Sequence, residues 1–187
     1  MKHLKKTLVA GLLAACSHAW AAPTLSIVTT PNPSQVGSVV DVDVRIADAV
    51  DLYSYNFTLN FDASLFRAIG VNEGTFLGTA GATDFGYARI DNTAGNVSYV
   101  YGYVFGPEFG ATGSGSLAHI QFEALGIGSG AFSFSDLMFL DSAFNELAVT
   151  ADAGAQADVP EPASYALFGI GLFGAAALGR RRLTMHG

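Results

Sequence analysis

The stretch VVDVDVRI, residues 39–46, decides the fold. Apolar and polar side chains alternate strictly along it, which is the pattern of a β-strand that buries one face and exposes the other to water. The valines and Ile46 form the apolar face, and Asp41, Asp43 and Arg45 form the solvated one. Because such a strand needs a second layer to cover its apolar face, the stretch predicts a protein of two packed β-layers.

The next stretch, DLYSYNFTLNF at residues 51–61, repeats this alternation with aromatic residues. It predicts a second strand with Ser54, Asn56, Thr58 and Asn60 on its polar face and a core face of Tyr53, Tyr55, Phe57, Leu59 and Phe61. Asp48 and Asp51 lie between the two strands and are typical turn residues, so we expect the chain to turn there.

Similar alternation recurs along the rest of the chain, and no long stretch has a helical period. Clear strands are predicted at 97–105, 117–125 and 131–135, and weaker ones at 25–29, 65–71, 75–77, 85–90, 137–140 and 147–150. Many short strands separated by turn residues indicate an all-β, two-sheet antiparallel sandwich or jelly roll over residues 22–157. We expect the Gly-Ser run 113–116 to be a loop and the domain to end within 151–158, where small and acidic residues replace aromatic ones.

Residues 1–21 have the composition of a secretory signal peptide. Lys2, Lys5 and Lys6 precede a short apolar run, and Ala19 and Ala21 provide the small side chains of a cleavage site after Ala21. The protein is therefore predicted to leave the cytoplasm.

An alternative cleavage signal lies within the same leader. Leu13-Ala14-Ala15-Cys16 resembles the lipobox of bacterial lipoproteins, in which Cys16 would carry the lipid. If Cys16 is instead removed with the signal peptide, the mature protein has no cysteine and can form no disulfide.

The charge of the central region limits its partners. Between residues 22 and 159 only Arg45, Arg67 and Arg89 oppose fifteen acidic residues, which gives a net charge of −12. Such a surface repels phosphate backbones, so nucleic-acid binding is not expected.

The same region is poor in catalytic groups, so we predict no enzymatic activity. It contains one histidine, His119, which lies in a predicted strand, and it has no cysteine or lysine. Asp41 and Asp43 could form a glycosidase pair, but they lie on a solvated strand face. No cofactor is expected, although the acidic turns at Asp48/Asp51 and Asp91/Asn92 leave calcium binding open.

Tyr99, Tyr101 and Tyr103 share one face of a predicted strand. They could stack on sugar rings if that face were exposed. The opposite face, with Val100, Gly102 and Val104, is a weak core face, which favours the tyrosines as interior residues.

The order of these motifs resembles a cohesin domain over residues 24 to 151. The matching pieces are VVDVDVRI, DLYSYNFTLNFDASLF with Asp62 and Leu65, NEGTFL with Gly74, GSGSLAHIQFEALGIGSG and DLMFLDSAFNEL. The resemblance implies a jelly roll of two antiparallel sheets and a role in non-covalent recognition, in that family of a calcium-bearing dockerin. No partner-contacting residue is carried over by it.

Residues 158–187 resemble the PEP-CTERM sorting signal of Gram-negative bacteria that make exopolysaccharide. Its parts are the Pro160-Glu161-Pro162 motif, an apolar run at 165–178 that would form a short transmembrane helix, and Arg180, Arg181 and Arg182 on the cytoplasmic side. The resemblance implies that an exosortase recognises and cuts the signal.

Together these features predict a secreted, non-enzymatic binding or structural protein of the cell surface or exopolysaccharide matrix. It would be held transiently in the inner membrane with its body in the periplasm. Two alternatives stay open, a true cohesin that recruits a dockerin-bearing protein and a carbohydrate-binding or carbohydrate-active protein, so the expected partner is either an extracellular polysaccharide or a dockerin-like module.

Overall fold

The computed structural model describes residues 22–106, 108–152 and 154–161. The leader with Cys16, Ala19 and Ala21 lies outside these residues. So do Pro162, the C-terminal apolar run and the arginine cluster at 180–182. No helix in the described ranges is long and apolar enough to cross a membrane.

The described chain consists of ten strands and one short 3₁₀ helix. They are β1 (Thr24–Thr30), β2 (Val39–Phe61), β3 (Phe66–Glu73), η1 (Leu77–Thr79), β4 (Ala82–Phe85), β5 (Arg89–Asp91), β6 (Asn96–Phe105), β7 (Ala111–Ala124), β8 (Gly128–Asp141), β9 (Thr150–Ala151) and β10 (Ala155–Val159).

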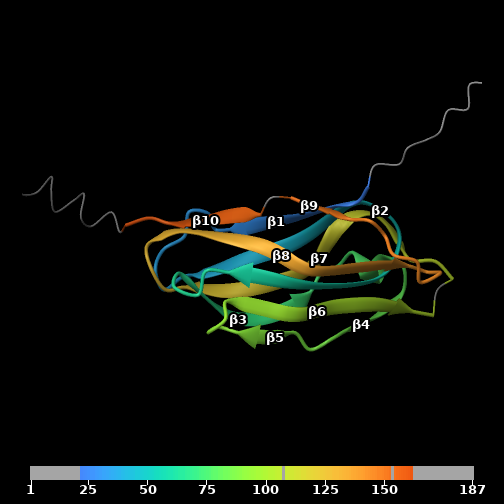
Figure 1. Cartoon of the computed structure of the whole chain (residues 1–187), viewed down its shortest axis with the longest axis horizontal. Helices are drawn as coiled ribbons and strands as arrows, with labels where there is room; N and C mark the ends of the chain where they lie inside the picture. The colour runs from blue at the N-terminus through green and yellow to red at the C-terminus, as the bar shows by residue number, and fades with distance from the viewer. Residues whose placement is uncertain (1–21, 107, 153, 162–187) are drawn as a thin grey trace, which may run out of the picture.

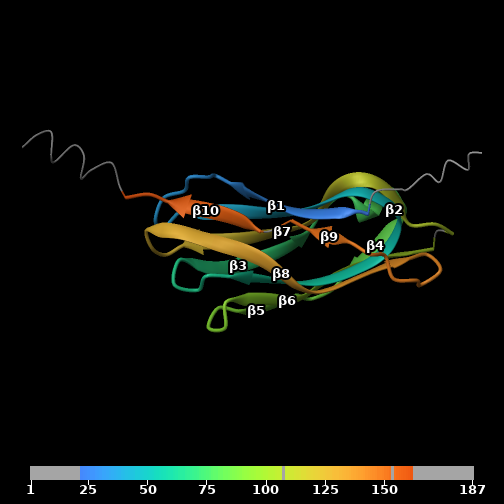
Figure 2. The same cartoon turned by 45° about the horizontal axis from the view of Figure 1, so that its top comes forward.

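The strands form two layers that are joined by β2 (Figures 1 and 2). The first half of β2 pairs with β1 and β7, and β3 extends this layer beyond β7. The second half of β2 pairs with β6 and β8, to which β4, β5 and β10 are added. All these pairs are antiparallel, and among the strands described the short contact between β1 and β9 is the one parallel pair. The predicted β-sandwich is therefore confirmed.

The turn expected at Asp48 and Asp51 is not formed, and β2 runs through this region as one strand of 23 residues. Asp48 and Asp51 have φ angles of 56° and 58°, and the register of β2 against β7 shifts on either side of Ala49. These bulges bend the strand from one layer into the other. They also change the phase of the alternation, so Leu52 is buried and Tyr53, expected in the core, is only half-buried.

The core lies between the two layers. Val40, Val42, Val44 and Ile46 are buried, as the alternation predicts. Beside Val40 in the same layer, Phe122 contacts Phe61 and Phe132 of the other layer, with ring centroids 4.9 and 5.0 Å apart. Each such ring, fully buried, contributes about 1.5–3 kcal/mol to folding.

The expectation of a loop at residues 113–116 was wrong. The Gly-Ser run 113–116 lies inside β7, where Gly113, Gly115 and Ser116 pair with β2. Phe76 packs against this part of the strand, and a methyl group on Gly115 would come within 2.9 Å of its Cβ. The stretch 151–158 includes most of β10, in which Ala157 and Val159 are buried.

The first strand begins and the last strand ends at opposite ends of the long axis of the sandwich (Figures 1 and 2). The loop between β8 and β9 lies at the end where β1 begins. The loop between β7 and β8 lies at the end where β10 stops.

Candidate binding groove

The tyrosine row of β6 faces the solvent. Tyr99, Tyr101 and Tyr103 are 62%, 39% and 37% exposed, whereas Val100 and Val104 are fully buried. The interior placement favoured by the sequence was therefore wrong. The reason is a bulge at Tyr99, which has a φ of 56° and lies where the register of β6 against β2 shifts by one residue.

The pairing of β6, β2 and β8 turns this tyrosine row into one wall of a groove. Ser54 of β2 lies between Tyr103 and Leu140, and Asn56 lies between Tyr101 and Met138. Small polar side chains thus form the floor, and larger side chains on both neighbouring strands rise beside them. The groove encloses about 510 Å³.

Phe144 also lines the groove and packs edge-on against Tyr53 at 5.6 Å between ring centroids. Its loop is held by the carboxylate of Asp141, which accepts hydrogen bonds from the backbone N–H groups of Ala143 at 2.9 Å and Asn145 at 2.8 Å. The side-chain amide of Asn145 also donates to Asp141, and these bonds hold the pKa of Asp141 below its usual value.

Asp51 joins this loop to the bulge in β2. Its carboxylate accepts hydrogen bonds from the hydroxyl of Ser142 at 2.7 Å and from the N–H of Gly110. Partial burial acts to raise the pKa of Asp51, but the bonds from Ser142 and Gly110 outweigh it and leave the pKa lowered. The turn residue expected from the sequence therefore acts as a brace beside the groove.

Two hydrogen bonds support the tyrosine wall, one to Asp84 of β4 and one from Tyr55 below the wall. The hydroxyl of Tyr103 donates to Asp84 at 3.1 Å, and this hydrogen bond raises the pKa of Tyr103. Below the wall, Tyr55 is buried and donates to the carbonyl of Leu117 at 2.6 Å, and burial raises its pKa above the usual value.

The residues that line the groove carry no formal charge. They are Tyr53, Ser54, Tyr55, Asn56, Tyr99, Tyr101, Gly102, Tyr103, Met138 and Phe144. Their aromatic faces and neutral polar groups are suited to binding an uncharged ligand that is apolar on one side and polar on another.

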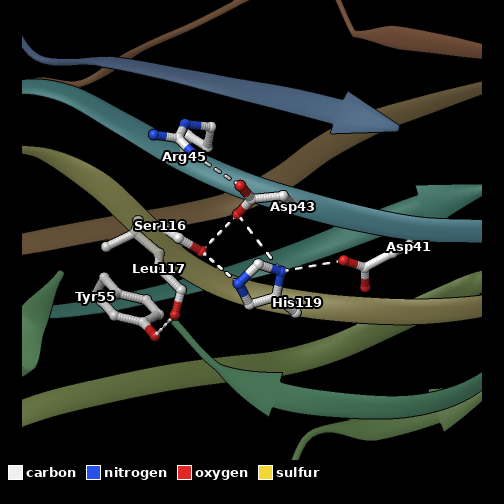
Figure 3. A network of polar contacts seen from close by, with 7 residues as sticks. All are labelled: Asp41, Asp43, Arg45, Tyr55, Ser116, Leu117 and His119. Carbon is white, nitrogen blue, oxygen red and sulfur yellow. Dashed lines mark hydrogen bonds and ion pairs between the residues drawn. The ribbon is translucent and has the colours of Figure 1, made fainter. Parts of the chain in front are cut away.

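A second cluster lies between β2 and β7, on the other layer (Figure 3). His119 Nε2 lies 3.2 Å from Oγ of Ser116, and His119 Nδ1 lies 3.3 Å from the carboxylate of Asp41. Asp43 accepts a short hydrogen bond from Ser116 and pairs with Arg45 at 2.9 Å. The alternation predicted that Asp41, Asp43 and His119 lie on strand faces, but no sequence pattern indicated that Ser116 would contact Asp43 and His119.

The order Ser116, His119, Asp41 resembles a nucleophile, base and acid, but the hydroxyl of Ser116 donates its hydrogen bond to the carboxylate of Asp43, which can only accept. Figure 3 shows Ser116 in contact with both Asp43 and His119. Ser116 is only 7% exposed and does not line the groove. What this geometry provides is a cross-strand polar contact that fastens β2 to β7.

The acidic turns considered for calcium use their oxygens locally. Asp91 accepts hydrogen bonds from the N–H groups of Thr93 and Ala94, and the amide of Asn92 both accepts from and donates to the backbone of Ala68. Across residues 22–106, 108–152 and 154–161, no three His, Cys, Asp or Glu side chains are grouped so that they could hold a metal ion.

The two bridged layers and the groove on one of them define a β-sandwich recognition domain. The family model of the Cohesin domain matches residues 23–156, and the chain belongs to this family. A second family model, the PEP-CTERM protein-sorting motif, matches residues 158–182.

Several solved cohesins share the fold. A non-cellulosomal cohesin from Archaeoglobus fulgidus is 18% identical, with a TM-score of 0.58 over 74% of this chain and 92% of the other. The third ScaC cohesin of Acetivibrio cellulolyticus, solved with a ScaB dockerin, is 18% identical, with a TM-score of 0.61 over 74% and 99%. A type II cohesin from the cellulosome of the same organism is 15% identical, with a TM-score of 0.59 over 73% and 95%. None of the curated protein sequences matches the chain.

These findings show an exported, cell-surface-directed protein that carries a cohesin-type binding module and a sorting motif. Pro160 and Glu161 are exposed and follow the last residue of β10 directly. The motif thus begins where the folded domain ends.

Proposed function

We propose that this protein is a non-enzymatic binding protein of the cell surface or exopolysaccharide matrix, and that its aromatic groove binds a segment of uncharged polysaccharide. An exosortase cuts the sorting signal after a transient stage in which the apolar run lies in the inner membrane and the body lies in the periplasm. The observation that carries the ligand assignment is the exposure of Tyr99, Tyr101 and Tyr103 beside a polar floor.

The groove offers both kinds of contact that a sugar chain uses. The C–H faces of a pyranose ring stack on aromatic rings, and its hydroxyl groups form hydrogen bonds with neutral polar groups such as Ser54 and Asn56. Residues two apart in a strand are separated by about 7 Å, so Tyr101 and Tyr103 present successive platforms along the direction of β6.

The surroundings of the groove argue against two other ligand types. An anionic chain would find no cation among the lining residues, and Asp84 at the wall would repel it. A peptide that binds by adding a strand needs a free strand edge, whereas β2 under the groove is paired on both sides, with β6 and β8.

A dockerin-like protein module is the second candidate partner, and membership of the cohesin family favours it. One of the similar structures contains a cohesin with a dockerin. Exposed tyrosine, phenylalanine and methionine side chains in one patch are also typical of the residues that dominate protein interfaces.

Calorimetric titration of the secreted protein with cellohexaose, chitohexaose and the host's own exopolysaccharide tests the ligand class. We expect binding to an uncharged chain and at least a tenfold weaker affinity for Tyr101→Ala, which corresponds to about 1.4 kcal/mol. Tyr87→Ala is the matched control, because Tyr87 is fully exposed and does not line the groove. Binding that Tyr87→Ala weakens as much as Tyr101→Ala, or no binding to any of the glycans, would contradict the assignment.

Intact-mass analysis of protein from the medium and from membranes, with and without the exosortase, tests the sorting step. The secreted form should begin after Ala21 and lack Arg180–Arg182, and replacing Pro160-Glu161-Pro162 by alanines should leave the protein in the membrane fraction. A lipid on Cys16, or a secreted form that retains the three arginines, would contradict this route.

A further inference from the structure

The last strand is held firmly at the point where the sorting signal begins. Val159 is buried and pairs with Gly128 of β8. On the other side of β10, the side chain of Asn32 donates to the carbonyl of Gln156 and accepts from the N–H of Asp158, both at 3.0 Å. The N–H of Ser34 donates to the carbonyl of Asp158 at 2.7 Å. The exit point of the chain is therefore fixed relative to the domain.

Aliphatic side chains are exposed on the loops around this exit. Val36 is 48%, Leu125 is 43% and Ile127 is 47% exposed. Val36 lies in the loop between β1 and β2, and the other two lie in the loop between β7 and β8, which Figures 1 and 2 place at the end where β10 stops. We call these three residues the exit tip.

The backbone fastens the loops of the exit tip to one another. The N–H of Gly37 donates to the carbonyl of Ala124 at 2.8 Å, and the N–H of Ala124 donates to Ser38 at 3.0 Å. The N–H of Leu125 donates to Leu65 at 2.7 Å. The loops that carry Val36 and Leu125 are thus hydrogen-bonded to their neighbours, and Ile127 lies two residues beyond Leu125 in the same loop.

Only five residues, 160–164, separate Val159 from the apolar run that begins at Tyr165. The six Cα–Cα steps from Val159 to Tyr165 span at most about 22 Å in a fully extended chain. When the run lies in a bilayer, the end of the domain that carries the exit tip must therefore lie close to the lipid surface.

From this geometry we propose that the exit tip rests on the lipid bilayer while the sorting signal is in the membrane, so that the domain stands with its β10 end toward the lipid. This inference depends on the membrane stage of the proposed function. Asp62 and Asp158 belong to the same end of the domain, so the contact favours zwitterionic over anionic lipid headgroups.

Single fluorescent labels on the full chain in phosphatidylcholine nanodiscs test the inference. With Cys16 replaced by serine, an environment-sensitive dye is attached in turn to Val36→Cys, Ile127→Cys and Phe144→Cys. Phe144 is a matched control because it is also exposed, at 70%, and its loop lies at the opposite end of the domain. We expect blue-shifted emission and quenching by nitroxide-labelled lipid at positions 36 and 127 but not at 144, with weaker quenching in phosphatidylglycerol-rich discs.

Equal quenching at positions 36, 127 and 144, or none at 36 and 127, would overturn the inference. A label at Gly169→Cys, within the apolar run, separates the two proposals. Quenching at 169 without quenching at the exit tip leaves the membrane stage standing and rejects the lipid contact. No quenching at 169 rejects both, whereas the glycan titration stays an independent test of the groove.

Discussion

The ring of Tyr101 lies directly over the backbone of Gly86. A methyl group on Gly86 would come within 1.7 Å of Cε1 of that ring, and the N–H of Gly86 donates to the carbonyl of Tyr101 at 2.9 Å. The absence of a side chain at residue 86 therefore sets how Tyr101 presents its face to the groove.

Replacing Gly86 with alanine should disturb the groove and leave the fold intact. The new methyl group must push the ring of Tyr101 aside, so we expect an affinity for the glycan at least fivefold lower and a change in unfolding free energy below about 1 kcal/mol. Calorimetric titration and urea denaturation measure the two effects. Gly78→Ala is the control, since its methyl group would meet no atom within 4 Å. Unchanged glycan affinity in Gly86→Ala would show that the orientation of Tyr101 is unimportant.

Tyr55→Phe should lower the stability of the sandwich. The substitution removes a buried hydrogen bond to the carbonyl of Leu117, which keeps the N–H of Gly74 as a second partner at 2.8 Å. Because that carbonyl is not left without a donor, we expect a loss of about 0.5–1.5 kcal/mol in the free energy of unfolding. Urea denaturation checks the value. An unchanged free energy of unfolding would show that this hydrogen bond contributes nothing to stability.

Acid should destabilise the protein through its hydrogen-bonded aspartates. The pKa of Asp62 is lowered by Ser64, that of Asp91 by the N–H of Ala94 and that of Asp141 by Asn145. A carboxyl group whose pKa is lower in the folded state stabilises the fold above its unfolded pKa of about 3.9 and loses that contribution as the pH falls through the folded value. The urea midpoint should therefore fall between pH 5.5 and pH 3.

Asp51→Asn should lower the urea midpoint already at pH 5.5 and should make the midpoint fall less steeply as the pH is lowered. Partial burial acts to raise the pKa of Asp51, but the hydrogen bonds from Ser142 and Gly110 outweigh it and leave the pKa lowered, so this carboxylate is one of those that stabilise the fold above about pH 4. Asp136→Asn, at an exposed carboxyl on β8, is the control. If the urea midpoint of Asp51→Asn changed with pH in the same way as that of the unmodified protein, the bracing role assigned to Asp51 would be contradicted.

Asn32→Ala should loosen β10 without affecting the rest of the sandwich. It removes two hydrogen bonds from this strand, so we expect faster hydrogen exchange of the amide of Asp158. Asn92→Ala is a chemically matched control, since the amide of Asn92 makes the same pair of bonds to the backbone of Ala68 in β3. Faster exchange at Ala68 in that variant, and not at Asp158, would show that each clamp acts locally.

The alternation of apolar and polar residues predicted the sandwich and most of its core, because a strand that buries one face has apolar residues at every second position. It failed where the backbone bulges. Nothing in the sequence around Tyr99 indicates that it adopts a positive φ angle, yet its bulge moves Tyr99, Tyr101 and Tyr103 to the outer face. The exposure of the tyrosine row could therefore not be read from β6 alone.

The remaining groove residues depend on contacts between distant parts of the chain. Met138 reaches the groove because its strand pairs with β2 at Asn56, and register between strands is not encoded locally. Phe144 has a weak local signal, an Asp and an Asn four residues apart that close its loop. Ser54 and Asn56 were correctly expected on the solvated face, but not as the floor of a groove.

The pairing of β8 with β10 determines how the protein would bear a mechanical load. β8 carries Met138 in the groove wall, and its first residues pair with β10 along Ala155–Val159. With the C-terminal end held and a ligand pulled from the groove, part of the tension would pass along β8 into β10, and part into β2, with which β8 also pairs. Interstrand hydrogen bonds lie across the strands, so this tension loads them together in shear and does not open them one after another. A domain loaded in this way would resist the pull through several hydrogen bonds at once.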